Sequence, residues 1–213
     1  MFKSLTVLTA SSIALSSTAL ADDARTFDLA SFDRIDIATG ISAKISVGSE
    51  QSIRVETNKG DFEDLVIKVD DGVLEIRQDW KSNWRGGSKK PRYKVIASVQ
   101  DLNGIDASSG SSVTATGISG GDFSVEVSSG ASVDLTGTCD RIDAKGSSGA
   151  DTSAKNLVCE NADARASSGA SLVLHADTGV QAKASSGGTI TVYGGATDVS
   201  TRKSSGGSIR IRD

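Results

Sequence analysis

The sequence has few aromatic residues, almost no proline or histidine, and no long apolar run beyond its first residues. Its 213 residues include five Phe, two Trp, two Tyr, one Pro and one His. So few rings argue against a sandwich core filled by aromatic side chains. The single histidine, His175, argues against a Ser-His-Asp triad and against a metal site built from several histidines.

Other classes of function lack their usual signals. After the first 21 residues, no stretch of about 18 apolar residues exists, so no membrane span is expected. The formal net charge of −4 does not suggest a nucleic-acid partner. The phosphate-binding loop that ends in Gly-Lys-Ser or Gly-Lys-Thr is missing, and so is the Gly-Gly-x-Gly-x-Asp calcium repeat. We therefore expect no cofactor and no metal.

The first 21 residues have the three-part order of an export signal. One basic residue, Lys3, precedes an apolar stretch that ends in Ala19-Leu20-Ala21, a small-x-small pattern for signal peptidase. The alternative is a buried N-terminal helix. Residues 1–21 are therefore predicted to be a signal peptide, and the protein is expected in the periplasm, on the cell surface or outside the cell, where disulfides form.

Glycine and serine are abundant, and their spacing gives the sequence a period. The chain has 23 Gly and 34 Ser. The tripeptide Ser-Ser-Gly occurs six times, at intervals of 18 to 20 residues, with its glycine at positions 110, 130, 149, 169, 187 and 206. Without a period, so much Gly and Ser would suggest disorder, whereas this period indicates a repeat architecture.

Apolar and polar residues alternate on both sides of each Ser-Ser-Gly. Three residues after the glycines stand Val113, Val133, Thr152, Leu172, Ile190 and Ile209. Five residues before them stand Ile105, Val125, Ala144, Ala164, Ala182 and Thr201. This alternation predicts a half-buried strand on each side of the turn, with large side chains on one wall and mostly small ones on the other. A unit of about 19 residues cannot close a core alone, so we predict an all-β fold, a right-handed parallel β-solenoid, or β-helix, of stacked coils.

Residues 33–100 lack the tripeptide but keep the alternation typical of strands. In the segment Val69–Val73, Asp71-Gly72 stands between strand-like flanks, which predicts a hairpin. We expect residues 33–100 to form an N-terminal β-cap with the first strands, and residues 101–213 to form the repeat coils of the same single domain. Residues 22–32 are expected to be a flexible tail.

Several segments together resemble a known family. They are Phe32-Asp33-Arg34-Ile35-Asp36-Ile37, Gly40-Ile41-Ser42-Ala43-Lys44-Ile45, Gly72-Val73-Leu74-Glu75-Ile76 and Val99-Gln100-Asp101-Leu102-Asn103-Gly104-Ile105-Asp106, followed by the Ser-Ser-Gly coils. In this order they resemble the head GIN domain of auto-transporter adhesins, a domain of unknown function, over residues 32–213. The resemblance implies an exported parallel β-helix and supplies no catalytic residues.

The two cysteines stand at nearly equivalent points of adjacent coils. Cys139 and Cys159 follow Gly130 and Gly149 by nine and ten residues. Their Cα atoms are therefore expected about 5 Å apart, within disulfide range. In an oxidising compartment we predict a structural disulfide, and the alternative is a pair of free buried thiols.

Residues 79–93 differ in composition from the rest of the chain. They hold both Trp residues, the only Pro and five bases against one acid. Exposed Trp rings can stack on sugar rings, and the Lys and Arg side chains beside them can pair with phosphate or carboxylate groups. The candidate contacts for an anionic glycan are Trp80, Lys81, Trp84, Arg85, Lys89, Lys90, Arg92 and Tyr93. The alternative is a loop whose Trp residues plug the end of the solenoid.

Charged residues stand four positions before the repeat glycines. They are Asp106, Glu126, Lys145, Arg165, Lys183 and Arg202, and the last four put one base on each coil. Asp143 and Asp163 lie two residues earlier in the same strands. Like charges about 5 Å apart in water repel by only about 1 kcal/mol, so a solvated face is expected.

These observations favour an exported, non-enzymatic β-solenoid that serves as a binding or structural module of the bacterial envelope. An anionic glycan is its candidate partner. The alternative is a polysaccharide-acting β-helix enzyme, for which Asp143, Asp151 and Asp163 are the candidate carboxylates. The sequence does not predict an oligomeric state.

Overall fold

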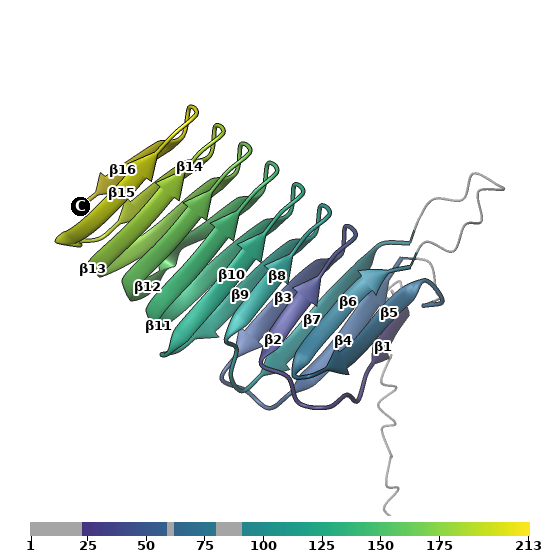
Figure 1. The fold of residues 1–213 in the computed structure, drawn as a ribbon. Helices are drawn as coiled ribbons and strands as arrows, with labels where there is room; N and C mark the ends of the chain where they lie inside the picture. Colours follow the sequence, from purple (N-terminus) through teal and green to yellow (C-terminus); the bar gives the residue numbers. More distant parts are fainter. Residues whose placement is uncertain (1–22, 59–61, 80–90) are drawn as a thin grey trace, which may run out of the picture.

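The computed structural model describes residues 23–58, 62–79 and 91–213, which form strands and no helix (Figure 1). The strands are β1 (Asp23–Thr26), β2 (Arg34–Ile37), β3 (Ser42–Val47), β4 (Ser52–Thr57), β5 (Leu65–Asp70), β6 (Val73–Gln78), β7 (Tyr93–Val99), β8 (Gly104–Ala107), β9 (Ser112–Ile118), β10 (Asp122–Val127), β11 (Ser132–Gly146), β12 (Asp151–Ala166), β13 (Ser171–Ala184), β14 (Thr189–Tyr193), β15 (Asp198–Lys203) and β16 (Ser208–Arg212).

The Ser-Ser-Gly tripeptides are tight turns, as the period predicts. In the first of them, Ser109 and Gly110 both have positive φ, at 54° and 73°. The N–H of Ser111 donates to the carbonyl of Ser108 at 3.1 Å, which closes the turn. The N–H of Gly110 donates to the carbonyl of Ser129 in the next turn, and equivalent bonds join the later turns into a ladder along one edge (Figure 1). Two successive positive φ angles explain the glycine of each turn.

Parallel pairing stacks the strands into two faces that meet at the turns. The pre-turn face consists, in spatial order, of β6, β2, β8, β10, the second halves of β11, β12 and β13, and β15. The post-turn face consists of β7, β3, β9, the first halves of β11, β12 and β13, then β14 and β16. The predicted parallel β-solenoid is therefore confirmed.

The N-terminal end departs from the order of the chain. The coil β2–β3 comes first in sequence but lies between β6–β7 and β8–β9. Beyond it, β5 pairs antiparallel with β6 through the predicted hairpin at Asp71-Gly72, and β4 pairs antiparallel with β7. These antiparallel strands cover one end of the two parallel stacks, an end whose backbone groups would otherwise lie open.

Strand β1 corrects the expectation of a flexible tail over residues 22–32. Residues 23–26 pair antiparallel with β4, beginning at Asp23 opposite Thr57. The ring of Phe27 then packs edge-on against that of Phe62, with centroids 6.3 Å apart. The physical reason is the free edge of β4, whose unpaired backbone groups bind the segment that precedes the first coil.

The core of the repeat coils is narrow, as the sequence predicts. Leu172 of the post-turn face is fully buried and lies against Gly146 of the pre-turn face. A Cβ atom added at Gly146 would come within 2.9 Å of the Leu172 side chain and 3.1 Å of the Ala170 Cβ. A large side chain on one wall therefore meets small residues on the other, which leaves little room for rings.

Candidate functional site

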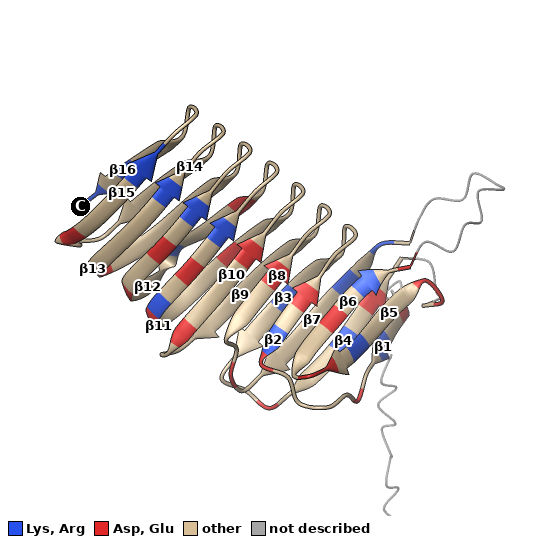
Figure 2. Cartoon of the chain, viewed as in Figure 1, with Lys and Arg blue, Asp and Glu red and all other residues tan. Residues whose placement is uncertain are grey.

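A row of charged residues runs along the pre-turn face, with one member from each coil (Figure 2). In spatial order its members are Glu75, Asp36, Asp106, Glu126, Lys145, Arg165, Lys183 and Arg202, each in register with the next. We call this set the charged row. Its first four members form the acidic half and its last four the basic half, so the sign changes once, between β10 and β11. Neighbouring strands are about 4.8 Å apart.

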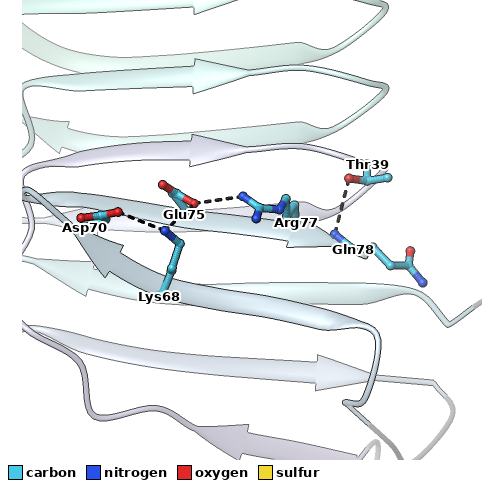
Figure 3. A network of polar contacts seen from close by, with 6 residues as sticks. All are labelled: Thr39, Lys68, Asp70, Glu75, Arg77 and Gln78. Atoms are coloured by element: carbon cyan, nitrogen blue, oxygen red, sulfur yellow. Dashed lines mark hydrogen bonds and ion pairs between the residues drawn. The ribbon is translucent and has the colours of Figure 1, made fainter. Parts of the chain in front are cut away.

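The acidic half begins in an ion-pair network on the β5–β6 hairpin (Figure 3). The carboxylate of Glu75 accepts from Arg77 at 3.0 Å and pairs with Lys68 at 3.2 Å. Lys68 also donates to Asp70 at 3.1 Å, and these two hydrogen bonds, that to Asp70 first, raise the pKa of the Lys68 ammonium. The network orients Glu75 at the end of the row.

The next two acids destabilise each other in their ionised forms. Partial burial raises the pKa of the Asp36 carboxyl, and the charges of Asp106 and Glu75 raise it further. Burial also raises the pKa of Asp106, against the opposing effect of Arg34, whose guanidinium lies 3.6 Å away. The ionised forms of Asp36 and Asp106, side by side and partly buried, are therefore unfavourable for the folded chain at neutral pH.

Substitution of Asp36 by Asn is expected to stabilise the protein at neutral pH. Because the folded state binds the Asp36 proton more tightly than the unfolded state, stability is lost as pH rises from the ordinary value of 3.8 through the raised folded pKa. Asp36→Asn should therefore raise the Tm at pH 7 by about 1 to 2 °C, and the gain should disappear as the pH falls to about 3.8. Circular dichroism during heating measures this.

The matched control is Asp151→Asn, whose carboxyl is exposed on the post-turn face. Its Tm should stay that of the unsubstituted protein. An Asp36→Asn protein that is no more stable than this control at pH 7 would contradict the mutual repulsion inferred for the acidic half.

Beside the basic half, the pre-turn face is hollowed into a shallow groove. The groove is lined by the charged residues Glu126, Lys145, Arg165 and Lys183 and by the first serines of three turns, Ser147, Ser167 and Ser185. Side chains of Lys145 and Arg165 are 47% and 50% exposed. Cationic donors and hydroxyls therefore lie side by side, an arrangement that suits an anion with a polar surface.

The basic half is only partly neutralised within the chain. Lys145 lies 3.7 Å from Glu126, and Arg165 lies 3.4 Å from Asp143. Within the part of the chain that the structure describes, no ion pair involves Lys183 or Arg202. Cationic charge at this end of the pre-turn face thus remains available to a ligand.

The three carboxylates of the enzymatic alternative do not come together. Asp143 and Asp163 are neighbours on the pre-turn face, whereas Asp151 lies on the post-turn face. Asp143 is paired with Arg165 and Asp163 with Arg141, at 3.4 and 2.6 Å. The described residues hold no group of three or more His, Cys, Asp or Glu arranged to bind a metal ion.

Six of the eight residues proposed to contact a glycan lie outside the described residues. These six are Trp80, Lys81, Trp84, Arg85, Lys89 and Lys90. Of the other two, Arg92 is exposed, and its backbone N–H donates to the side chain of Asn58 at 2.8 Å. Tyr93 is only 3% exposed, and its ring stacks on Phe62 with centroids 6.1 Å apart. The Tyr93 ring therefore belongs to the core of the cap.

Cys139 and Cys159 form the predicted disulfide. They are register partners in β11 and β12, with Cα atoms 4.5 Å apart. Both residues are buried. The bond fastens two adjacent coils at the corner opposite the turns.

Six members of the charged row were predicted from the period, but Asp36 and Glu75 were not. Neither residue precedes a Ser-Ser-Gly tripeptide. A sequence pattern could have found them, namely an acid between two apolar residues. It occurs in Ile35-Asp36-Ile37 and Leu74-Glu75-Ile76, and again in Val125-Glu126-Val127 of the repeat coils. Register with β8 then places both acids in the row.

Among solved structures, a "putative adhesin" from Bacteroides fragilis has the same fold, with a TM-score of 0.67 and 16% sequence identity over 89% of this chain and 96% of that chain. A "putative lipid binding protein" from Parabacteroides distasonis gives a TM-score of 0.48 at 15% identity, over 88% of this chain and 95% of that chain. No curated protein matches the sequence.

The described residues include no helix that is long and apolar enough to cross a membrane. The family model described as "Putative auto-transporter adhesin, head GIN domain" matches residues 31–196, which is well over half of the chain. The chain therefore belongs to the family of auto-transporter adhesin head GIN domains.

Proposed function

We propose that the protein is an exported, non-enzymatic binding module of the bacterial envelope that holds an anionic glycan along the basic half of the charged row. The predicted signal peptide, the disulfide and the family support export to the periplasm, the cell surface or the medium. The observation that carries the proposal is the series of four bases, one per coil, beside a groove lined by serine hydroxyls.

The geometry of the basic half suits an extended polyanion better than a small anion. Lys145, Arg165, Lys183 and Arg202 repeat at the strand spacing of about 4.8 Å and point from one flat face. Successive anionic groups of a polymer can therefore pair with successive coils. Serine hydroxyls beside the bases supply hydrogen bonds to the neutral oxygens of sugars.

Residues 80–92, without the buried Tyr93, are proposed as a second contact for the same ligand. In the sequence the segment stands between β6 and β7, and the end of β6 lies at the edge of the solenoid where the turns lie. At that edge the N–H of Gln78 donates to the Thr39 hydroxyl at 3.4 Å. Its two Trp residues and five bases match the chemistry of anionic sugars. Among the described residues, the exposed side chain of Arg92 supports this second contact.

Binding to polygalacturonate, an anionic polysaccharide, tests the proposal by calorimetry. The variant Lys145→Gln/Arg165→Gln/Lys183→Gln should bind about tenfold more weakly than the unsubstituted protein, because it removes three cationic contacts. The binding should also weaken as salt is raised. Neutral dextran should not bind.

The matched control is Lys44→Gln/Lys155→Gln/Arg210→Gln, which changes net charge equally at exposed positions outside the pre-turn face. Its affinity should stay within about twofold. Equal losses in both variants, or no binding at all, would overturn the proposal. A loss found only in Trp80→Ala/Trp84→Ala would move the contact to residues 80–92.

The same mixture distinguishes the enzymatic alternative. A binding module leaves the polygalacturonate at its original length. Release of shortened chains that is lost in Asp163→Asn would instead support a polysaccharide-acting enzyme. The pairing of Asp143 and Asp163 with arginines and the distance of Asp151 on the other face favour the first outcome.

A further inference from the structure

The charges of the charged row are segregated by sign rather than mixed. Adjacent like charges repel by about 1 kcal/mol in water, whereas alternating signs would attract. A surface that served only solubility would carry the two signs interspersed. Ion pairs within the chain offset part of this repulsion, but within the described residues none involves Asp36, Lys183 or Arg202. Figure 2 shows the two halves on one face.

We propose that two copies of this chain associate through their pre-turn faces in an antiparallel arrangement, with a two-fold axis parallel to the strands that passes between β10 and β11. Such an axis reverses the solenoid direction of the second copy and keeps the charged row opposite itself. This interface goes beyond the proposed glycan binding.

The two-fold axis pairs every acid of the charged row with a base. Because four acids lie on one side of the axis and four bases on the other, no residue of the charged row is left without an opposite charge. Glu126 faces Lys145 of the second copy, Asp106 faces Arg165, Asp36 faces Lys183, and Glu75 faces Arg202. Symmetry repeats each pair, so eight opposite-charge pairs form. A parallel arrangement would place acids on acids and bases on bases.

Near the axis, the neighbouring outward positions also avoid like charges. Asp122 and Arg141 are register partners on the two sides of the axis, so each faces the other across the interface. By the same registers, Asp143 faces Ser124, Asp163 faces Gly104, and Arg34 faces Gln181. Arg77 meets Ser204. Asp198, in the same column as Asp122 and Arg141, comes opposite the turn at Asp71 that precedes β6, so one contact at the edge of the interface brings acids together.

The shape and size of the face suit such a contact. On the turn side of the row the outward positions after Arg77 are small, namely Ala38, Ser108, Ser128, Ser147, Ser167, Ser185 and Ser204. Small side chains allow two flat sheets to approach closely. Eight strands at about 4.8 Å and three outward columns give roughly 700 Å² per copy, close to the 800 Å² of a standard interface.

The second copy and a polyanion would use the same bases and therefore compete. The association is accordingly tested without polysaccharide, by sedimentation velocity of the purified full chain. At about 0.01 M salt, where charges interact over about 30 Å, the protein should sediment as a dimer. At about 1 M salt, where the range falls to about 3 Å, it should sediment as a monomer.

Charge-reversal variants test the register of the interface. Variant one is Lys145→Glu/Lys183→Glu, and variant two is Asp36→Lys/Glu126→Lys. In a dimer of either variant with itself, four of the eight opposite-charge pairs become like-charge pairs. Each variant should therefore self-associate about a hundredfold more weakly than the unsubstituted protein. Mixed together, the two variants restore all eight pairs, so the mixture should form a heterodimer at low salt. Single substitutions Lys145→Glu and Glu126→Lys repeat the test in case Asp36→Lys unfolds the chain.

A monomer at low salt would overturn the proposal. So would a dimer that both variants still form by themselves, since its interface would lie elsewhere, and so would a mixture of folded variants that stays monomeric. Failure here is separate from failure of glycan binding, because variant two keeps the whole basic half and should still bind polygalacturonate if the proposed function is correct.

Discussion

Replacement of Gly137 by Ala is expected to lower the unfolding free energy by about 3 kcal/mol or more. Gly137 lies in β11 at the corner opposite the Ser-Ser-Gly turn, with a φ of 139° that L-residues rarely adopt. An added Cβ atom would overlap the carbonyl oxygen of Ile118 in the preceding coil. The three nearest atoms are all backbone atoms of Ile118, so no side-chain rotation relieves the overlap. Urea denaturation should show a lower midpoint with an unchanged slope.

Gly195→Ala is the control for this substitution. No heavy atom lies within 4 Å of a Cβ atom built at Gly195, and its φ lies outside the left-handed region. Its stability should change by less than about 0.5 kcal/mol. If Gly137→Ala were as stable as Gly195→Ala, the close approach of adjacent coils at this corner would be wrong.

Removal of the disulfide should have an effect of similar size. Cys139 and Cys159 are separated by 20 residues, and a cross-link over such a loop stabilises by about 3 kcal/mol in the chain-entropy model. Cys139→Ala/Cys159→Ala should therefore lower the Tm by about 6 to 12 °C. The solenoid should still form, because parallel pairing continues on both sides of the bond. Thermal unfolding measured by circular dichroism tests this.

The reducing agent dithiothreitol supplies the control. It should lower the Tm of the unsubstituted protein toward that of the double variant and leave the double variant unchanged. Identical Tm values for the unsubstituted protein and the double variant would show that the cross-link between these coils contributes nothing to stability.

The repeat coils were predictable because each one carries the same local signals. A turn with two successive positive φ angles favours glycine, which adopts such angles without strain. The alternation of apolar and polar residues in the strands beside each turn predicts which side chains are buried. Cys139 and Cys159 followed from the same register. The cap was harder, since β2–β3 lies between coils that come later in sequence, an arrangement set by long-range pairing. Strand β1 carries no apolar alternation, and only the free edge of β4 explains it.

The sequence alone predicted only part of the candidate site. Bases that precede the repeat glycines suggested a solvated ridge, because their spacing alone does not show a groove or the serines beside it. The sequence showed the change of sign between Glu126 and Lys145, but the equal length of the two halves became clear only when register joined Asp36 and Glu75 to Asp106. For Tyr93, composition was misleading, because packing against Phe62 buries its ring.

The most direct test of whether the charged row binds the ligand is to map where a polyanion binds. Backbone amide chemical shifts can be followed by NMR as oligogalacturonate is added to the variant Asp36→Lys/Glu126→Lys, which should stay monomeric and keep the basic half. The shifts should change along β11, β12, β13 and β15, with the largest changes near Lys145, Arg165 and Lys183. Changes confined to the post-turn face, or to residues near Arg92, would contradict the account.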